Sequence, residues 1–233
     1  MLTKIISLLS QTTLFSGLEA SDLTACALAF REKRFAKGQT LFLRGDPGTH
    51  VYLVETGLVR LAISNANGRR LSFQIAMEGD LFGEIAALDN MPRTADATAL
   101  TAVTVYCVER HAFAEIWSTR PVLATRVVVF LCHRLRQATN QIESIALQPV
   151  EVRLARFILS SLGDDHAPPP GKRLPMELGF SQGELSQLLG ATRPKVNAAI
   201  ASLEKAGAVR RTPDRLFCDP VALARIAQCP EEV

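Results

Sequence analysis

One apolar repeat in the middle of the chain constrains the fold more than any other feature. Pro121 suits the first turn of a helix, and Pro149 disfavours helical geometry in the residue before it, so one long helix is predicted between them. Apolar side chains recur there at alternating spacings of three and four residues: Val128, Leu131, Leu135, Ala138, Ile142 and Ile145. This spacing predicts a coiled-coil seam with a second copy of the chain. The alternative is a long amphipathic helix that packs on its own domain.

The residues before this helix read as a β-domain. From Arg31 to about Val108, glycines and other turn residues separate short segments of alternating or β-branched character. Strands are predicted over residues 39–43, 51–54, 58–63, 70–75 and 102–108. Short strands with frequent turns are typical of a sandwich or barrel, and a β jelly-roll with flanking helices is the expected architecture.

The stretch from Leu81 to Ala95 carries polar residues that a strand-rich domain does not need, and we refer to it as the cassette. Gly83-Glu84 places a carboxylate in a turn, and Arg93-Thr94 places a guanidinium beside a hydroxyl. Backbone N–H groups, an arginine fork and a hydroxyl can converge on a phosphate, while a carboxylate accepts from a sugar hydroxyl. The pattern predicts an anionic ligand such as a sugar phosphate. The alternative is an exposed Glu–Arg pair that brackets a loop.

Beyond the long helix, residues 150–162 are predicted to form another helix, followed by a polar, proline-rich loop over 163–172. Two helices joined by a tight turn are predicted over residues 181–204. Ser181 and Glu184 form a capping box, Gly190 lies at the turn, and Thr192 caps the second helix. This is the arrangement of a helix-turn-helix, although a generic helical hairpin shares it.

Basic residues in a short hairpin after these helices favour a DNA-binding helix-turn-helix over a generic helical hairpin. Arg210 and Arg211 lie before a turn at residues 212–214, where a wing would meet phosphates. The residues expected to contact DNA are Ser181, Gln182, Thr192, Arg193, Lys195, Asn197, Ala198, Arg210 and Arg211.

Composition narrows the functional classes. The chain has 233 residues, 48% of them hydrophobic and 21% charged, with a net charge of +3, so charge alone neither requires nor excludes nucleic acid. The apolar runs fall short of the roughly 18 residues of a membrane span, and the N-terminus does not read as a signal peptide. We therefore expect a cytoplasmic protein with no membrane partner. The five cysteines and four histidines are scattered, which predicts no metal site, no required cofactor and no catalytic residues.

Taken in order, these parts resemble the cyclic-AMP receptor protein (CRP/FNR) family of bacterial transcription regulators. The resemblance covers residues 12 to 220 and rests on the order of β-domain, cassette, long helix and winged helix-turn-helix. It implies a cyclic-nucleotide-binding-like jelly-roll with cAMP or cGMP as the effector. The cassette residues that would hold the ribose and cyclic phosphate are Phe82, Gly83, Glu84, Arg93, Thr94 and Ala95.

The resemblance also assigns residues on the long helix. It implies that Arg134 approaches the ligand, and that Ala138-Thr139 stands where two hydroxyl residues contact the base across the dimer. Ala138 removes one hydroxyl, which leaves the base preference open. In the second helix of the pair, Arg193 keeps a family arginine that can bind guanine, and Asn197 can read an adenine or a phosphate. The glutamate and second arginine of the family pattern are replaced, so the family half-site does not carry over.

The expected protein is a homodimeric transcription regulator and not an enzyme. Residues 1–118 form the effector domain, 119–148 the dimerisation helix and 149–233 the DNA-binding domain, with double-stranded promoter DNA and RNA polymerase as partners. Two alternatives stay open. One is the same regulator with a non-nucleotide signal, redox or gas, for which Cys132, His133 or a haem is the detector. The other is a nucleotide-binding module that controls a partner protein.

Overall fold

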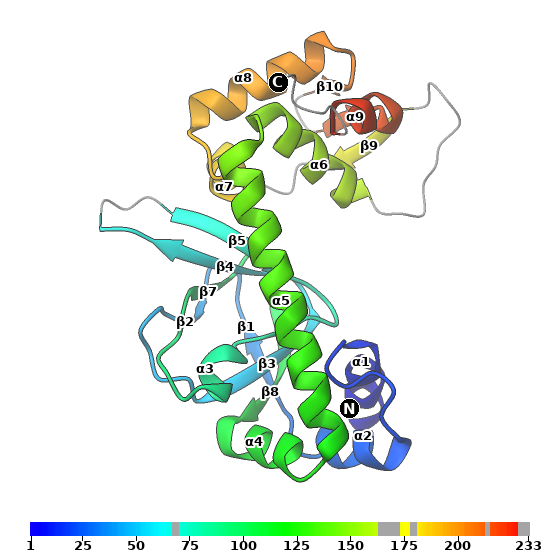
Figure 1. Ribbon diagram of the computed structural model, residues 1–233. Coiled ribbons are helices and arrows are strands. Elements are labelled where there is room, and N and C mark those ends of the chain that lie inside the picture. The colour runs from blue at the N-terminus through cyan, green and yellow to red at the C-terminus, as the bar shows by residue number, and fades with distance from the viewer. Residues whose placement is uncertain (67–69, 163–172, 178–180, 213–214, 228–233) are drawn as a thin grey trace. The chain divides into compact units, whose positions relative to one another are not determined.

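The computed structural model describes residues 1–66, 70–162, 173–177, 181–212 and 215–227 (Figure 1). Contacts within the chain divide it into two compact units, Met1–Ala138 and Thr139–Val233. The division falls within the longest helix, α5 (Pro121–Leu147). The expected order of a β-rich domain, a long helix and a helix-turn-helix is confirmed, whereas the domain boundaries at residues 118 and 148 stay predictions.

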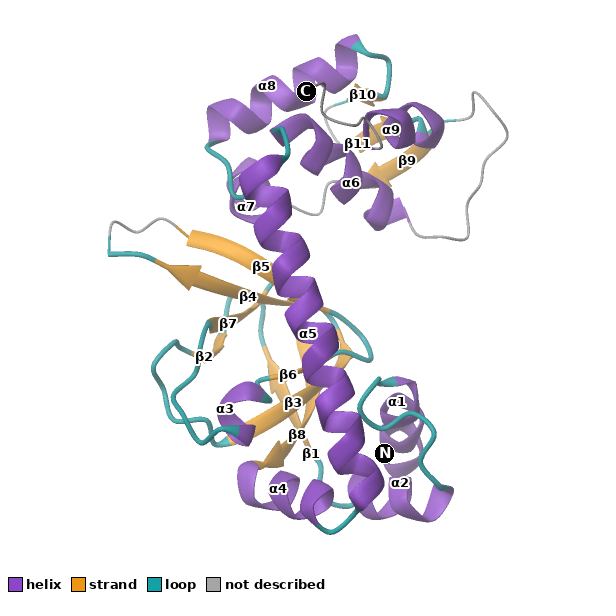
Figure 2. Ribbon diagram, viewed as in Figure 1, coloured by secondary structure: helices purple, strands orange, loops and turns teal. Residues whose placement is uncertain are grey.

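Two antiparallel four-stranded sheets build the β-domain of the first unit (Figure 2). One sheet has the order β1 (Arg31–Phe35), β8 (Val103–Glu109), β3 (His50–Thr56), β6 (Leu81–Phe82). The other has the order β2 (Thr40–Phe42), β7 (Asp96–Ala99), β4 (Val59–Ser64), β5 (Arg70–Ala76). Neighbours in each sheet are mostly far apart in sequence, as a jelly-roll requires.

The five predicted strands correspond to β2, β3, β4, β5 and β8, while β1, β6 and β7 were not predicted. β1 reads Arg-Glu-Lys-Arg-Phe and is largely exposed, so it lacks an apolar pattern, yet it pairs with β8 along its whole length. β7 alternates buried alanines with half-buried polar residues, and alanine has low strand propensity. Both strands owe their conformation to partners elsewhere in the sequence.

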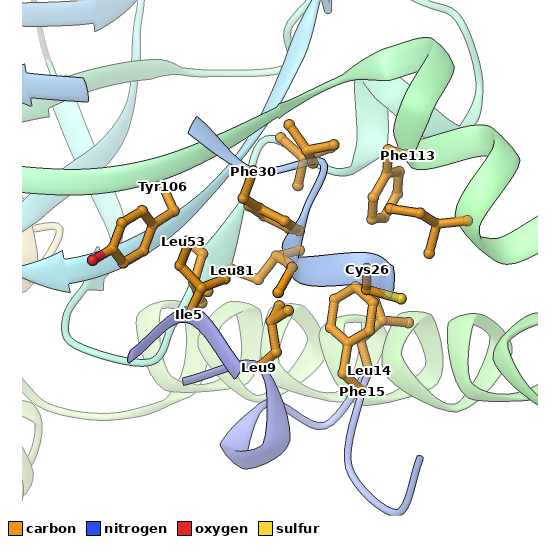
Figure 3. Close-up of a cluster of buried hydrophobic side chains, with 14 of the residues drawn as sticks. Ile5, Leu9, Leu14, Phe15, Cys26, Phe30, Leu53, Leu81, Tyr106 and Phe113 are labelled. Carbon is orange, nitrogen blue, oxygen red and sulfur yellow. The ribbon is translucent and has the colours of Figure 1, made fainter. Parts of the chain in front are cut away.

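The helices of the first unit share a core with the β-domain. They are α1 (Leu2–Gln11), α2 (Ala20–Ala27), the short α3 (Ile85–Leu88), α4 (Arg110–Ser118) and the first part of α5. In this core, Ile5 and Leu9 of α1 lie among Phe30, Leu53 and Phe113 (Figure 3). A second buried cluster fills the space between the two sheets and contains the aromatic rings of Phe42, Tyr52 and Phe82.

The long helix α5 presents two different apolar stripes. Leu123, Val127 and Phe130 are buried in the core of the first unit, so part of the helix does pack on its own domain. The predicted seam lies on other positions: Val128 is 60% exposed and Leu135 is 68% exposed. The intramolecular packing therefore leaves most of the seam residues exposed in a single chain, whereas Ile145 is half-buried. Among the described residues, no helix combines the length and apolar character needed to cross a bilayer.

The second unit is a helix-turn-helix with a wing. Its elements are α6 (Val150–Leu162), β9 (Leu174–Glu177), α7 (Gln182–Leu188), α8 (Arg193–Lys205), β10 (Val209–Arg211), β11 (Arg215–Cys218) and α9 (Pro220–Ala227). The strands form an antiparallel sheet of order β10-β11-β9, and β9 was not predicted. The helices share a core that includes Leu154, Leu185, Val196, Leu203 and Leu223. The predicted proline-rich loop, and Pro213 and Asp214 of the predicted wing turn, lie outside the described residues.

Candidate effector site and DNA-binding surface

The cassette begins with a turn that only glycine fits. Gly83 follows β6 and has a left-handed φ of 79°. A Cβ at this position would lie 2.7 Å from Nη1 of Arg93, closer than a carbon atom can approach without displacing the guanidinium. The next residue, Glu84, stands at the N-terminal end of the short helix α3 (Ile85–Leu88). The turn thus brings Glu84 and Arg93 together although nine positions separate them in sequence.

Arg93 is a buried cation held by neutral groups. Its side chain donates from Nη1 to the Gly83 carbonyl at 2.7 Å and from Nη2 to the His50 carbonyl at 2.6 Å. Its guanidinium carbon lies 4.2 Å from the ring centroid of Phe42 and 5.8 Å from that of Tyr52. Burial lowers the pKa of Arg93.

Arg93 forms no direct ion pair with a carboxylate of the described residues, although the charges of Glu84 and Asp46 act on it from further away. Nε of Arg93 is buried without a hydrogen-bond partner, and the ion pairs among the described residues do not include this side chain. A buried cation whose direct contacts are carbonyl dipoles and aromatic faces is costly, and a bound anion would compensate it.

Glu84 is the second buried charge of the cassette and is paired with the long helix. Its Oε1 lies 3.3 Å from Nε of Arg134, which also donates from Nη2 to the Leu81 carbonyl. The Arg134 guanidinium lies 5.1 Å from the ring centroid of Phe130, its neighbour on α5. Burial raises the pKa of Glu84, while the charge of Arg134 acts in the opposite direction.

The other predicted effector residues differ in their surroundings. Phe82 is fully buried, with its ring stacked 5.2 Å from that of Tyr52, so its side chain anchors the turn from inside the core. Thr94 is exposed and Ala95 is buried beside Arg93 in sequence. Ala138 and Thr139 are exposed on α5 at the boundary of the two units. The effector role of all these residues stays a prediction.

Three contacts of the cassette were not anticipated from sequence. His50 supplies a carbonyl to Arg93 across 43 positions of chain, and Phe42 and Tyr52 supply the ring faces. These residues lie on β2 and β3 and read as ordinary strand residues. No local signal marks them, because the pairing of the strands alone brings them to Arg93.

The helix-turn-helix carries its predicted capping box. Ser181 Oγ accepts from the Glu184 backbone N–H at 3.3 Å, and Glu184 Oε2 accepts from the Ser181 N–H at 2.8 Å. Thr192 occupies the N-cap position of α8 as predicted, but its side chain makes no capping hydrogen bond, so the predicted side-chain cap is wrong. Pro194 in the first turn fixes the backbone geometry there instead.

The predicted DNA-contact residues are exposed on α7, α8 and the wing. They are Ser181, Gln182, Thr192, Arg193, Lys195, Asn197, Ala198, Arg210 and Arg211. On the same helix as Arg193, the side chains of Val196 and Ile200 are buried, so α8 presents its polar N-terminal residues outward. In the wing, the Arg210 guanidinium lies 5.3 Å from the Phe217 ring centroid. The contacts themselves stay predictions.

Known proteins share both halves of this arrangement. Residues 32–120 match the family model of the cyclic nucleotide-binding domain, and residues 152–226 match that of the Crp-like helix-turn-helix domain. The CRP-like cAMP-activated global transcriptional regulator of Mycobacterium tuberculosis is 30% identical over 222 residues, which covers 95% of this chain and 99% of that protein. The cyclic AMP receptor protein of Thermus thermophilus is 26% identical over 210 residues, or 90% and 94% of the two chains. The structure of FixK2 from Bradyrhizobium japonicum shares the fold, with a TM-score of 0.72 at 21% identity over 87% of this chain and 99% of that one.

A cyclic nucleotide-binding domain followed by a Crp-like helix-turn-helix domain defines a class of transcriptional regulators with a sensing part and a DNA-binding part. The chain belongs to the CRP/FNR family of that class.

Proposed function

We propose that the protein is a homodimeric, sequence-specific DNA-binding regulator, and that cAMP or cGMP bound in its β-domain controls it allosterically. The observation that carries the proposal is Arg93, a buried guanidinium with no carboxylate partner among the described residues, placed beside Gly83 and Glu84. A cyclic phosphate supplies the missing negative charge, and a ribose hydroxyl supplies a donor for Glu84. The names of the two relatives described above refer to cyclic AMP, which further supports this choice of effector.

Effector binding would change the hydrogen bonds that now hold the cassette. Both terminal nitrogens of Arg93 donate to backbone carbonyls, so a phosphate has to compete for one or both of them. A hydroxyl that donates to Glu84 competes in the same way with Arg134. Because Arg134 belongs to α5, the exchange at Glu84 alters a contact between the β-domain and the long helix. This is the route by which the effector would bias the conformation of a dimer.

The DNA-binding part of the proposal rests on the exposed end of α8. Arg193 would bind a guanine edge, Asn197 an adenine or a phosphate, and the wing arginines the backbone. Two such helices must lie about 34 Å apart to enter successive turns of the major groove. The exposed apolar positions Val128, Leu131 and Leu135 supply the proposed dimer contact that sets this spacing. RNA polymerase is the proposed partner at the promoter.

Isothermal titration of the full-length chain with cAMP and with cGMP tests the effector. We expect saturable heat with at least one nucleotide, and at least a tenfold loss of affinity in Arg93→Lys, because lysine cannot make the two directed hydrogen bonds of the guanidinium. Far-ultraviolet circular dichroism checks that the variant is folded. Absence of heat with either nucleotide, from protein that still retards DNA, would refute the cyclic-nucleotide part.

A gel shift with and without the bound nucleotide then tests the coupling. The expected result is a difference in affinity for promoter fragments, and equal affinity in both conditions would contradict allosteric control. In vitro transcription with purified RNA polymerase, scored on a fragment that the protein retards, tests the proposed partner. An unchanged transcript yield would count against it.

A further inference from the structure

Gly183 is a glycine that the helix backbone does not require. It is the second residue of α7, within the capping box, and its φ is not in the left-handed region. Glycine inside a helix is less favourable than alanine, since it loses more conformational freedom on folding. A reason for the missing side chain therefore has to come from what lies beside it.

The space beside Gly183 is occupied by the guanidinium of Arg193. A Cβ at position 183 would lie 2.9 Å from Nη2, 3.5 Å from Cζ and 3.6 Å from Nε of Arg193, and these are the three nearest atoms. Arg193 is the first residue of α8, and its side chain lies beside Gly183 at the start of α7. Even a methyl group at 183 would displace the guanidinium. The helices can stay where they are, because the atom in the way is the far end of a flexible side chain.

We infer that Gly183 is a positioning residue for DNA sequence recognition, and that it acts by leaving room for Arg193. The inference rests on the proposed function, in which Arg193 reads a guanine. A guanidinium makes two parallel hydrogen bonds to a guanine only in one orientation. A side chain already confined near that orientation loses less freedom on binding than one that is free. Gly183 therefore contributes to sequence discrimination without contacting DNA.

A double-mutant cycle on the full-length chain tests this role. The probe is a DNA duplex selected from a randomised pool by the wild-type protein, compared with its single-base variants and with an unrelated duplex. Affinities are measured by fluorescence anisotropy for Gly183→Ala, Arg193→Ala and the double variant. The matched control is Ser202→Ala, an exposed position on α8 more than two turns from Arg193.

We expect Arg193→Ala to weaken the selected duplex by roughly 5- to 150-fold, the range for one bidentate contact. Gly183→Ala should reproduce a large part of this loss, and should lose preference for the same guanine in the single-base series. In the Arg193→Ala background, Gly183→Ala should have no further effect. Affinity for the unrelated duplex should not change, and the melting temperature of Gly183→Ala should not fall, since alanine suits a helix.

Three results would overturn the inference. In the first, Gly183→Ala keeps the wild-type affinity for the selected duplex. In the second, Gly183→Ala lowers affinity equally with and without Arg193, and in the third it lowers affinity equally for every duplex. The second would indicate a clash of the new methyl group with DNA. Failure of the proposed function is recognised separately, because a wild-type chain that selects no sequence contradicts specific DNA binding itself and removes the inference with it.

Discussion

Oε1 of Glu84 lies 3.3 Å from Nε of Arg134, which joins the turn after β6 to the long helix by a largely buried ion pair. Glu84 is only 4% exposed, so its carboxylate is removed from water and depends on Arg134 for compensation. Burial outweighs the attraction of Arg134 and raises the pKa of Glu84. The residue proposed to bind the effector hydroxyl is thus held in the protein at a cost in stability, as is common for binding sites.

Glu84→Gln should increase stability at neutral pH while it weakens nucleotide binding. The folded pKa of Glu84 is raised above its ordinary value of 4.5, so the folded state binds more protons and the carboxylate destabilises it as pH rises through that window. The advantage of the glutamine variant in urea unfolding should be largest near pH 7.5 and disappear as pH falls to about 4.5. Glu78→Gln, at an exposed site, should show no such advantage. A glutamine variant that is less stable at pH 7.5 would contradict the prediction.

Gly83→Ala should destabilise the first unit and abolish effector binding. Its left-handed φ strains any side chain by about 1–3 kcal/mol, and the added Cβ meets Nη1 of Arg93 at 2.7 Å. Gly79→Ala is a matched control, with a φ of 84° but no atom within 4 Å of the added Cβ. Both variants should have a lower melting temperature than the wild-type protein, and the decrease should be larger for Gly83→Ala. Calorimetry should show normal nucleotide binding for Gly79→Ala alone, and equal behaviour of the two variants would refute the contact with Arg93.

Arg210→Ala should weaken binding to all DNA sequences alike. An arginine that neutralises one phosphate contributes about one unit to the slope of log affinity against log salt concentration. The slope measured by anisotropy at several salt concentrations should fall by about that amount, with the sequence preference unchanged. Arg225→Ala removes an exposed arginine of α9, outside the proposed surface, and serves as the control. A change of sequence preference in Arg210→Ala would instead assign this residue to base recognition.

Leu135→Glu should convert the proposed dimer into a monomer. Leu135 is 68% exposed in the single chain, so the substitution has little effect on the fold of one subunit but buries a charge in the seam. Sedimentation equilibrium should give the molar mass of a monomer for this variant. It should give the mass of a dimer for Gln137→Glu, a substitution at an exposed position two residues further along α5. Because the variant is monomeric, its affinity for a duplex with two half-sites should be lower than that of the wild-type protein. A wild-type monomer, or a dimeric Leu135→Glu, would rule out this seam.

Much of the architecture is readable from the sequence because it depends on neighbours in the chain. The capping box of Ser181 and Glu184 needs only a spacing of three residues, and the structure shows both of its hydrogen bonds. The apolar periodicity of α5 and the turn residues between strands are equally local signals. They predicted five of the eight strands of the β-domain and the order of the domains.

The tertiary structure alone decided which groups surround the side chains that we propose to be functional. His50 and Phe42 meet Arg93 because β2 and β3 come to lie beside the cassette, and Arg134 meets Glu84 across fifty positions of chain. β1 and β7 exist because they pair with β8 and β4, although their own residues favour strands weakly. Likewise, the sequence does not show why residue 183 is a glycine, because the reason we propose is its contact with the Arg193 side chain. Contacts of this kind form between segments whose separation is set by the whole fold, so no local pattern encodes them.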